Sequence, residues 1–259
     1  MIINNTPSIY ETFLIKHKRE NTPLRCMFEL TYKCNLKCRH CYNINCNKQP
    51  LTTQQIKNIL NQLAVNRVFF IVFTGGEIFT REDIFDILEY ANRKKFVVSL
   101  LTNATLIDED KARRLSTYNI SGIEISIYAS YASLHDKITQ TEGSFYKSIK
   151  AAHILIKNKT RVHFNTMIFN DNYKTYPAIQ KLATSIGATS APGHIICPRR
   201  NGSKDNKHLA LSPNLFSSYL RKTYKDNLYF NPLPRAELLE LPLSKASHSS
   251  FAINPYGEL

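Results

Sequence analysis

The sequence contains no apolar run that approaches the roughly 20 residues required by a membrane-spanning helix. Its first residues, Met1–Asn5, lack the basic start and apolar core of a secretory signal peptide. Six cysteines are too dispersed over 259 residues for a secreted disulfide scaffold, and cytosolic thiols usually stay reduced. We therefore expect a cytoplasmic protein with no membrane partner.

The sequence also lacks any motif typical of nucleic-acid binding, although it is strongly basic. It has 34 Lys and Arg residues against 20 Asp and Glu residues, a formal net charge of +14. Such a surface attracts anions, including nucleic acids, acidic peptides and phosphorylated cofactors. Because the basic residues are scattered and form no single stripe, we interpret most of them as solvated helix surfaces and expect no nucleic-acid partner.

Three cysteines, Cys34, Cys38 and Cys41, lie close together with C-x3-C-x2-C spacing. Thiolates are soft ligands that select zinc, copper(I) or iron–sulfur clusters. A structural zinc site or an ordinary cubane cluster takes four protein ligands. With no obvious fourth ligand nearby, the spacing indicates a cluster with one open iron. A four-cysteine zinc site that includes Cys46 stays open as an alternative, although its spacing is not that of a zinc finger.

Apolar, β-branched runs alternate with amphipathic stretches along most of the chain. In one of these stretches, Thr52 and Gln55 form a plausible capping box before apolar residues at helical spacing. The expected strands are Arg25–Thr31, Val68–Thr74, Phe96–Thr102, Gly122–Ala129, Val162–Ile168 and Ala188–Cys197. The expected helices are Leu51–Asn66, one that begins near Arg81 with Thr80 and Asp83 as candidate caps, Asp108–Tyr118, Ser144–Lys157 with Ile149, Ala152, His153 and Ile156 on one side, Thr175–Ile186, and Ser212–Tyr224.

This alternation predicts the fold class. Strands that are buried on both faces and separated by helices favour a parallel sheet. Six successive strand–helix units predict an α/β protein with a partial (β/α)6 TIM-type parallel barrel, while a doubly wound sheet would show the same pattern. After Lys225 the chain becomes polar and rich in proline, with a short helical hint at Arg235–Leu241. We expect an irregular C-terminal extension there.

Small and polar residues stand at the ends of several expected strands. They are Gly75, Gly76 and Glu77 after the second strand, Thr102 and Asn103 at the end of the third, Ser126 late on the fourth, and Asn165 on the fifth. In a parallel α/β barrel the active site lies at the carboxyl ends of the strands. We therefore expect these residues to share one basin with the three cysteines.

The segment Cys34–Cys41, the turn Phe73–Glu77 and the strand end Ser99–Asn103 together resemble the radical S-adenosylmethionine (SAM) superfamily. The resemblance implies that the three cysteines bind a 4Fe–4S cluster whose fourth iron is chelated by the amine and carboxylate of SAM. It also implies the residues that bind SAM: His40 near the adenine, Gly75, Gly76 and Glu77 at the methionyl ammonium, Thr102 and Asn103 on the pocket floor, and Ser126 and Asn165 at the ribose or carboxylate. In that role the two glycines let the backbone approach, and Glu77 supplies a countercharge.

Other segments resemble the peptide-modifying branch of this superfamily. Ile125–Tyr128, His135–Thr139 and Gly143–Phe145 are similar to parts of enzymes that mature ribosomal peptides or sulfatases, and Ser249–Leu259 resembles the opening of the SPASM module. That module carries auxiliary clusters, but Ser244 stands where a cysteine is expected and the chain stops before the later cysteines. We expect no auxiliary cluster. The expected parts are residues 1–23 as an N-terminal extension, 24–225 as the radical SAM barrel, and 226–259 as a truncated SPASM-like segment.

The resemblance implies a radical SAM enzyme that cleaves SAM reductively to a 5′-deoxyadenosyl radical and abstracts hydrogen from a substrate. We expect the substrate to be a ribosomal peptide or protein, the electron donor to be a ferredoxin or flavodoxin, and peptide recognition to involve a separate protein. Two alternatives stay open: a radical SAM enzyme of small-molecule cofactor biosynthesis, and a truncated, non-catalytic cluster-binding protein.

The remaining cysteines and histidines have weaker signals. We expect Cys26 to be a buried packing residue, and Cys197, at the end of the sixth strand, to lie near the mouth of the site. His135 and Asp136 are expected to fix their loop rather than to catalyse. His194 could face either the substrate or the protein interior, and His153 is expected on a helix surface.

Overall fold

Parallel strands form one curved sheet, as the sequence predicts. In the computed structural model, which describes residues 12, 17, 19, 20, 22–43, 48–223 and 250–259, the strand order is β6-β5-β4-β3-β2-β1-β7. The strands are β1 (Arg25–Thr31), β2 (Phe70–Gly75), β3 (Val97–Thr102), β4 (Ile120–Ser126), β5 (Val162–Met167), β6 (Thr189–Gly193) and β7 (Ser250–Ile253). Every pair is parallel, and β6 and β7 do not pair with each other within the described residues. The expected α/β partial barrel is therefore confirmed.

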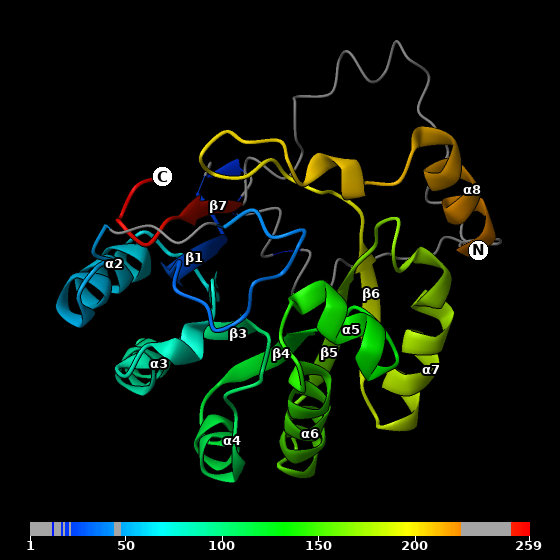
Figure 1. Cartoon of the computed structure of the whole chain (residues 1–259). Helices are drawn as coiled ribbons and strands as arrows, with labels where there is room; N and C mark the ends of the chain where they lie inside the picture. Colours follow the sequence, from blue (N-terminus) through cyan, green and yellow to red (C-terminus); the bar gives the residue numbers. More distant parts are fainter. Residues whose placement is uncertain (1–11, 13–16, 18, 21, 44–47, 224–249) are drawn as a thin grey trace, which may run out of the picture.

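Most of the helices lie in an arc outside the curved sheet (Figure 1). They are α2 (Thr53–Val65), α3 (Ile84–Arg93), α4 (Glu109–Ser116), α5 (Ala132–Thr139), α6 (Ser144–Lys157), α7 (Tyr176–Ser185) and α8 (Pro213–Thr223), with short 3-10 turns at Ile78–Thr80, Tyr173–Thr175 and Lys207–Leu209. The capping box of Thr52 and Gln55 is present at the start of α2. In the described part of the chain, no helix has both the length and the apolar character needed to cross a membrane.

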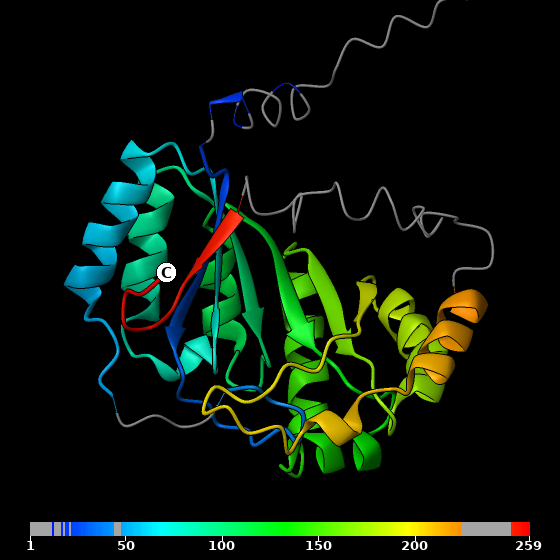
Figure 2. The ribbon, with the colours of Figure 1, turned by 90° about the horizontal axis from the view of Figure 1, so that it is seen from above.

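The C-terminal residues differ from the irregular extension that we expected. Residues Ser250–Ile253 form β7, which pairs in parallel with Arg25–Phe28 of β1 (Figure 2). A strand of four residues within a polar, proline-containing segment is too short to show a recognisable pattern. Its pairing partner is more than 200 residues away in the chain. Cys46, Ser244 and the helical hint at Arg235–Leu241 lie outside the described residues.

Strands β3, β4 and β5 bury one face, and not both as expected, whereas β2 is buried on both faces. Phe28, Leu100 and Phe164 are completely buried in the core against the helices. On the opposite face, residues such as Ser99 and Asn165 are only half-buried. This inner face therefore borders an open space inside the arc, where a ligand can be held.

The helix starts and faces differ from the expectations in two places. Asp83 stands before α3, but its carboxylate bonds Arg81 (2.6 Å) and Thr53 (2.5 Å) and does not cap the helix. On α6, His153 is exposed, as expected, but Ile149 and Ile156 are only half-buried, and the buried side is formed by Phe145, Ser148, Ala151, Ala152 and Leu155. The sequence pattern does not reveal this buried side, because the polar Ser148 forms part of it. The Ser148 hydroxyl can be buried since it donates a hydrogen bond to the Asn103 carbonyl (2.7 Å).

Helix α5 occupies the segment that we expected to be a loop, and it places two predicted structural residues. The His135 ring stacks on Tyr128 at 5.6 Å, and its Nδ1 accepts a hydrogen bond from the Tyr128 amide (3.2 Å). The Asp136 carboxylate accepts hydrogen bonds from the Gly143 amide (2.8 Å), the Ser144 hydroxyl (2.8 Å) and the Phe145 amide (2.9 Å). Asp136 thus caps the start of α6 from the neighbouring helix, as its expected fixing role requires.

We expect Asp136→Asn to lower the free energy of unfolding at pH 7 by about 1–2 kcal/mol, because one of the capped amides loses a charged acceptor. Burial alone would raise the pKa of Asp136, but the hydrogen bonds from Phe145, Ser144 and Gly143 hold it below its ordinary value. Its stabilising contribution is therefore present above the unfolded-state pKa and disappears as pH falls through the folded-state pKa. Urea denaturation of both proteins at several pH values should show the two stabilities converging in acid.

The matched control is Asp110→Asn, on an exposed side chain of α4. This variant should change stability by less than about 0.5 kcal/mol. An equal loss in the two variants would contradict the capping role of Asp136.

Candidate functional site

A loop that leaves β1 carries the three clustered cysteines. Cys34, Cys38 and Cys41 are free thiols and are half-buried. Burial raises the pKa of Cys34 to about 11 and shifts the pKa of Cys38 and of Cys41 in the same direction. Charge on Cys41 contributes to the raised pKa of the other two, so the three sulfurs lie in one region. Such thiols hold their protons until a metal binds and displaces them.

A hollow of about 290 Å³ opens at the carboxyl ends of the strands, and the cysteine loop forms part of its wall. Ten of the eleven site residues that the sequence predicts line it: Cys34, Cys38, His40, Cys41, Gly75, Gly76, Thr102, Asn103, Ser126 and Asn165. Sequence analysis missed Glu124 and Met167, which also line this inner hollow from β4 and β5. Both alternate with predicted residues along their strands, so the period of two could have identified them.

Glu77, the eleventh predicted residue, does not line the inner hollow. It is completely buried, and its carboxylate accepts hydrogen bonds from the Thr102 hydroxyl (2.8 Å), the Asn103 amide (2.7 Å) and the Phe79 amide (3.0 Å). Burial raises the pKa of Glu77, while these hydrogen bonds oppose the rise. Through these hydrogen bonds the side chain connects the end of β2 to the end of β3.

The two glycines are required by the protein's own main chain. Gly75 has φ +135°, and a Cβ atom there would lie 2.2 Å from the Thr31 carbonyl oxygen. A Cβ atom on Gly76 would lie 2.3 Å from the Lys33 carbonyl oxygen. The Gly76 amide donates to the Thr31 carbonyl (2.7 Å), and the Glu77 amide donates to the Lys33 carbonyl (2.9 Å). The absence of a Cβ atom at both positions thus allows the turn after β2 to pack closely against the cysteine loop.

His40, within the cysteine loop, and Asn103, beside it, make further contacts that hold the loop in place. The His40 ring packs against Tyr128 at 4.6 Å and Phe169 at 5.1 Å. Burial, with a smaller effect from Arg199, lowers the pKa of His40 to about 4, so the ring is neutral at pH 7. The Asn103 amide nitrogen donates to the Asn35 side chain (2.9 Å) and lies 3.8 Å from the Cys34 sulfur.

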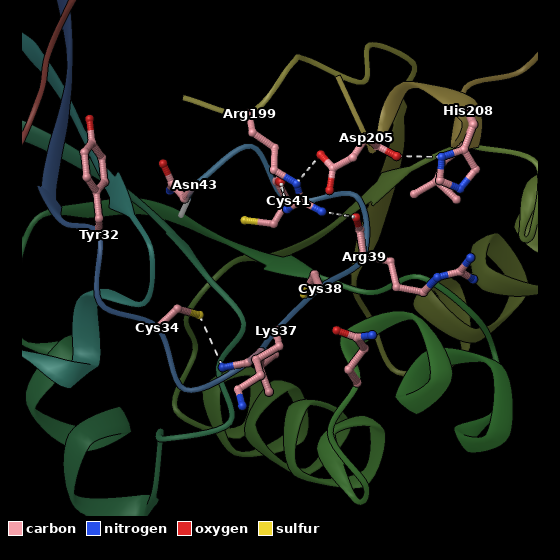
Figure 3. A pocket seen from close by; sticks show the side chains of 13 residues that line it. Tyr32, Cys34, Lys37, Cys38, Arg39, Cys41, Asn43, Arg199, Asp205 and His208 are labelled. Carbon is pink, nitrogen blue, oxygen red and sulfur yellow. Dashed lines mark hydrogen bonds and ion pairs between the residues drawn. The ribbon is translucent and has the colours of Figure 1, made fainter. Parts of the chain in front are cut away.

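Residues 196–209, which follow β6, form side-chain hydrogen bonds to the cysteine loop and to β1. Arg199 donates to the Cys41 carbonyl (3.0 Å, Figure 3), and Asn206 donates to the His40 carbonyl (3.2 Å). Arg200 bonds both carboxylate oxygens of the buried Glu29 (2.7 and 2.5 Å). These hydrogen bonds could not be predicted from the sequence, because no local sequence pattern connects residues that are about 160 positions apart.

The other sequence candidates have mixed outcomes. Cys26 is completely buried, as expected, and Cys197 is exposed and lines the inner hollow near its mouth. His194 does not line that hollow, and its ring packs against Phe216 (5.2 Å) and Tyr219 (6.0 Å). His194 therefore belongs to the packing beneath α8.

Comparison with known families decides what this arrangement is. The model of the Radical SAM superfamily matches residues 28–183, more than half of the chain. The chain belongs to the radical SAM superfamily. The matched region runs from β1 to α7 and includes every one of the predicted site residues.

Individual relatives are similar to this radical SAM chain over about half of their own length. The chain is 27% identical to an AdoMet-dependent heme synthase of Methanosarcina barkeri over 72% of the chain and 54% of the relative. It is 27% identical to the subtilosin biosynthesis protein AlbA of Bacillus subtilis over 92% of the chain and 54% of the relative. Among solved structures, Streptococcus suis SuiB bound to S-adenosylmethionine has a TM-score of 0.68 at 17% identity, covering 94% of this chain and 62% of SuiB.

The donor set of the inner hollow fits the cluster of this superfamily. Three free thiols approach from one loop, and soft sulfur ligands are those that iron–sulfur clusters require. Among the described residues, no three His, Cys, Asp or Glu side chains are grouped so as to hold a single metal ion. The zinc alternative that uses Cys46 involves a residue outside the described part of the chain.

We expect Gly76→Ala to disrupt the radical SAM site by pushing the turn after β2 away from the cysteine loop. The added methyl group would meet the carbonyl oxygens of Lys33 and Tyr32 at 2.3 and 2.7 Å, so main chain must move. The free energy of unfolding should fall by about 3 kcal/mol. The iron bound per chain after anaerobic reconstitution should fall as well.

Gly122→Ala is the matched control, since the nearest atom to its added methyl group would be the Arg161 carbonyl oxygen at 3.7 Å. Its stability and iron content should match those of the unmodified protein. Full iron binding by Gly76→Ala would show that the loop does not depend on this contact.

Proposed function

We propose that this chain is a radical SAM enzyme that acts on a peptide or protein. In this proposal Cys34, Cys38 and Cys41 hold a 4Fe–4S cluster, and SAM binds beside it in the inner hollow. The observation that carries the proposal is the meeting of these thiols with polar groups from β2 to β5 in one hollow at the carboxyl ends of parallel strands. When bound, the cluster and SAM would supply the one-electron cleavage that yields methionine and a 5′-deoxyadenosyl radical.

We propose the following roles for the residues around that pair. The neutral ring of His40 forms an apolar wall for the adenine, and Ser126 and Asn165 offer hydrogen bonds to the ribose or carboxylate. Asn165 is held in place by its hydrogen bond to Glu124 (3.1 Å). Gly75 and Gly76 would present main chain to the methionyl ammonium. Glu77 would act as a positioning residue, through the hydrogen bonds that orient Thr102 and Asn103.

Several relatives support a peptide or protein substrate. They include AlbA, the mycofactocin maturase MftC at 30% identity, a PqqA peptide cyclase, and the solved structure of SuiB bound to its precursor peptide SuiA. In this chain the inner hollow is bordered by Met167, Ile195, Ile196 and Cys197, which offer an apolar wall to a substrate side chain. We further propose a ferredoxin or flavodoxin as the electron donor and a separate protein for peptide recognition.

We propose residues 24–225 as the catalytic barrel, with residues 1–23 and 226–259 as flanking segments. The pairing of β7 with β1 joins the last described residues to the barrel sheet. Residues 250–253 of this proposed segment extend the sheet beside the strand that leads into the cysteine loop.

A second candidate is a radical SAM enzyme of small-molecule cofactor biosynthesis. The similarity to heme synthases over 72% of the chain favours it. Deleting the gene and comparing peptides by mass spectrometry with small metabolites by untargeted metabolomics separates the two candidates. A changed peptide supports the first proposal, and a changed tetrapyrrole or other small metabolite supports the second.

After anaerobic reconstitution with iron and sulfide, we expect the protein to form 5′-deoxyadenosine from SAM when dithionite is added, as measured by liquid chromatography and mass spectrometry. Replacing Cys34, Cys38 and Cys41 together by alanine should remove both the iron–sulfur absorption and the product. Cys26→Ala is the control, because Cys26 lies in the core on the other face of β1 and should leave both signals in place.

A reconstituted cluster that yields no 5′-deoxyadenosine would refute the enzyme proposal and leave the non-catalytic cluster-binding alternative. Zinc in place of iron, without iron–sulfur absorption, would refute the cluster assignment itself.

A further inference from the structure

The cysteine loop is a thin wall with a hollow on each side. Cys34, Cys38 and Cys41 line the inner hollow and also an outer hollow of about 390 Å³ (Figure 3). Cys34 also lines an adjacent hollow of about 770 Å³. The position of the proposed cluster can therefore be approached from the outer surface without passing through the barrel.

Basic side chains surround the two outer hollows. They are Lys37, Arg39 and Arg199 at the first, and Lys33, Lys48 and Arg81 at the second. We call these six residues the basic face. The only acidic residue that lines either hollow is Asp205, as far as the described residues show.

Part of this charge is neutralised, and part is available to a partner. The paired members are Arg39 with Asp171, Arg199 with Asp205, Lys48 with Glu258, and Arg81 with Asp83. Lys33 and Lys37 are exposed, and neither has an acidic partner among the described residues. These two lysines flank Cys34, so the excess positive charge lies directly beside the cysteine loop.

We propose that the basic face docks a small acidic electron-carrier protein of the flavodoxin type. This inference rests on the proposed function. The carrier's reduced flavin would give one electron to the cluster and become a semiquinone, and the cluster would be reduced by that electron. Complementary charge steers such encounters, and interfaces for electron transfer are small and weak, as fits a face of a few exposed side chains.

The placement of the face favours an electron carrier over an acidic substrate peptide. A peptide held here would lie on the outer side of the cysteine loop, whereas SAM is proposed to lie in the inner hollow. An electron can cross this wall, but a reacting carbon atom has to be on the inner side. The basic face is thus suited to supplying electrons and not to holding the reacting residue.

The test is the double charge reversal Lys33→Glu with Lys37→Glu in the reconstituted protein. The probe is a purified flavodoxin, and its dissociation constant is measured by titration of flavin fluorescence at low and high salt. The matched control is Lys94→Glu with Lys95→Glu, which makes the same change in net charge in the connection between α3 and β3, at the amino end of the strands.

We expect the reversal at the basic face to weaken flavodoxin binding at least tenfold at low salt and to flatten its salt dependence. The ratio of 5′-deoxyadenosine formation driven by reduced flavodoxin to that driven by dithionite should also fall at least tenfold. The control should change each quantity by less than about twofold, since its charges lie at the amino end of the strands and the basic face lies at the carboxyl end.

Unchanged binding and an unchanged ratio would overturn the docking proposal, as would equal losses in the control. Tight binding of a poly-glutamate peptide without any binding of flavodoxin would overturn it in favour of a peptide site. If dithionite and SAM yield no 5′-deoxyadenosine with the unmodified protein, the proposed function fails, and the flavodoxin titration still decides the docking.

Discussion

The site depends on one main-chain contact, where the turn after β2 packs against the start of the cysteine loop. The Gly76 and Glu77 amides donate hydrogen bonds to the carbonyls of Thr31 and Lys33. The two main-chain segments lie so close together that neither Gly75 nor Gly76 could carry a Cβ atom without a clash. Because the backbone groups are paired there, the loop leaves β1 in a defined direction. The buried Glu77 carboxylate connects this turn to the end of β3 by accepting a hydrogen bond from the Asn103 main-chain amide. The Asn103 side chain in turn lies beside Cys34.

The same loop is supported from the opposite direction by the segment after β6. Arg200 pairs with Glu29, whose buried carboxylate also accepts hydrogen bonds from Tyr32 (3.0 Å) and Tyr42 (2.8 Å). A buried charge of this kind is tolerated because all of its partners are present, and removing one of them leaves an uncompensated charge. The first strand of the open barrel is thus connected to the segment after the sixth strand through side chains rather than through sheet hydrogen bonds.

The two supports leave a wall of a few residues between an apolar interior and a basic exterior. On the inner side, His40 is neutral and packs against the rings of Tyr128 and Phe169, a setting that would help to exclude water in the proposed reaction. On the outer side, exposed lysines flank Cys34. Hydrogen abstraction and electron supply, as proposed, would therefore use opposite faces of the same loop.

Local patterns in the sequence were sufficient for the class of the fold and for naming most of the proposed site residues that meet in one hollow. The strands appeared as apolar runs, α6 has the predicted bounds, and ten of the eleven proposed site residues line the inner hollow. Such features depend on neighbours within a few positions: the spacing of cysteines, the period of a helix, and glycines at a strand end. The sequence by itself thus determined the parallel α/β class, the cysteine loop and the resemblance to the superfamily.

The tertiary structure decided what those residues do for one another. It made Glu77 an internal tie, assigned the glycines to the contact with Thr31 and Lys33, and placed the buried Ser148 against Asn103. It also added β7 to the sheet and brought Arg199 to Cys41 across 158 residues. These contacts join segments that are distant in the chain, and their geometry is set by the path of the whole sheet. Periodicity and spacing report only local neighbours, so no local pattern could have revealed them.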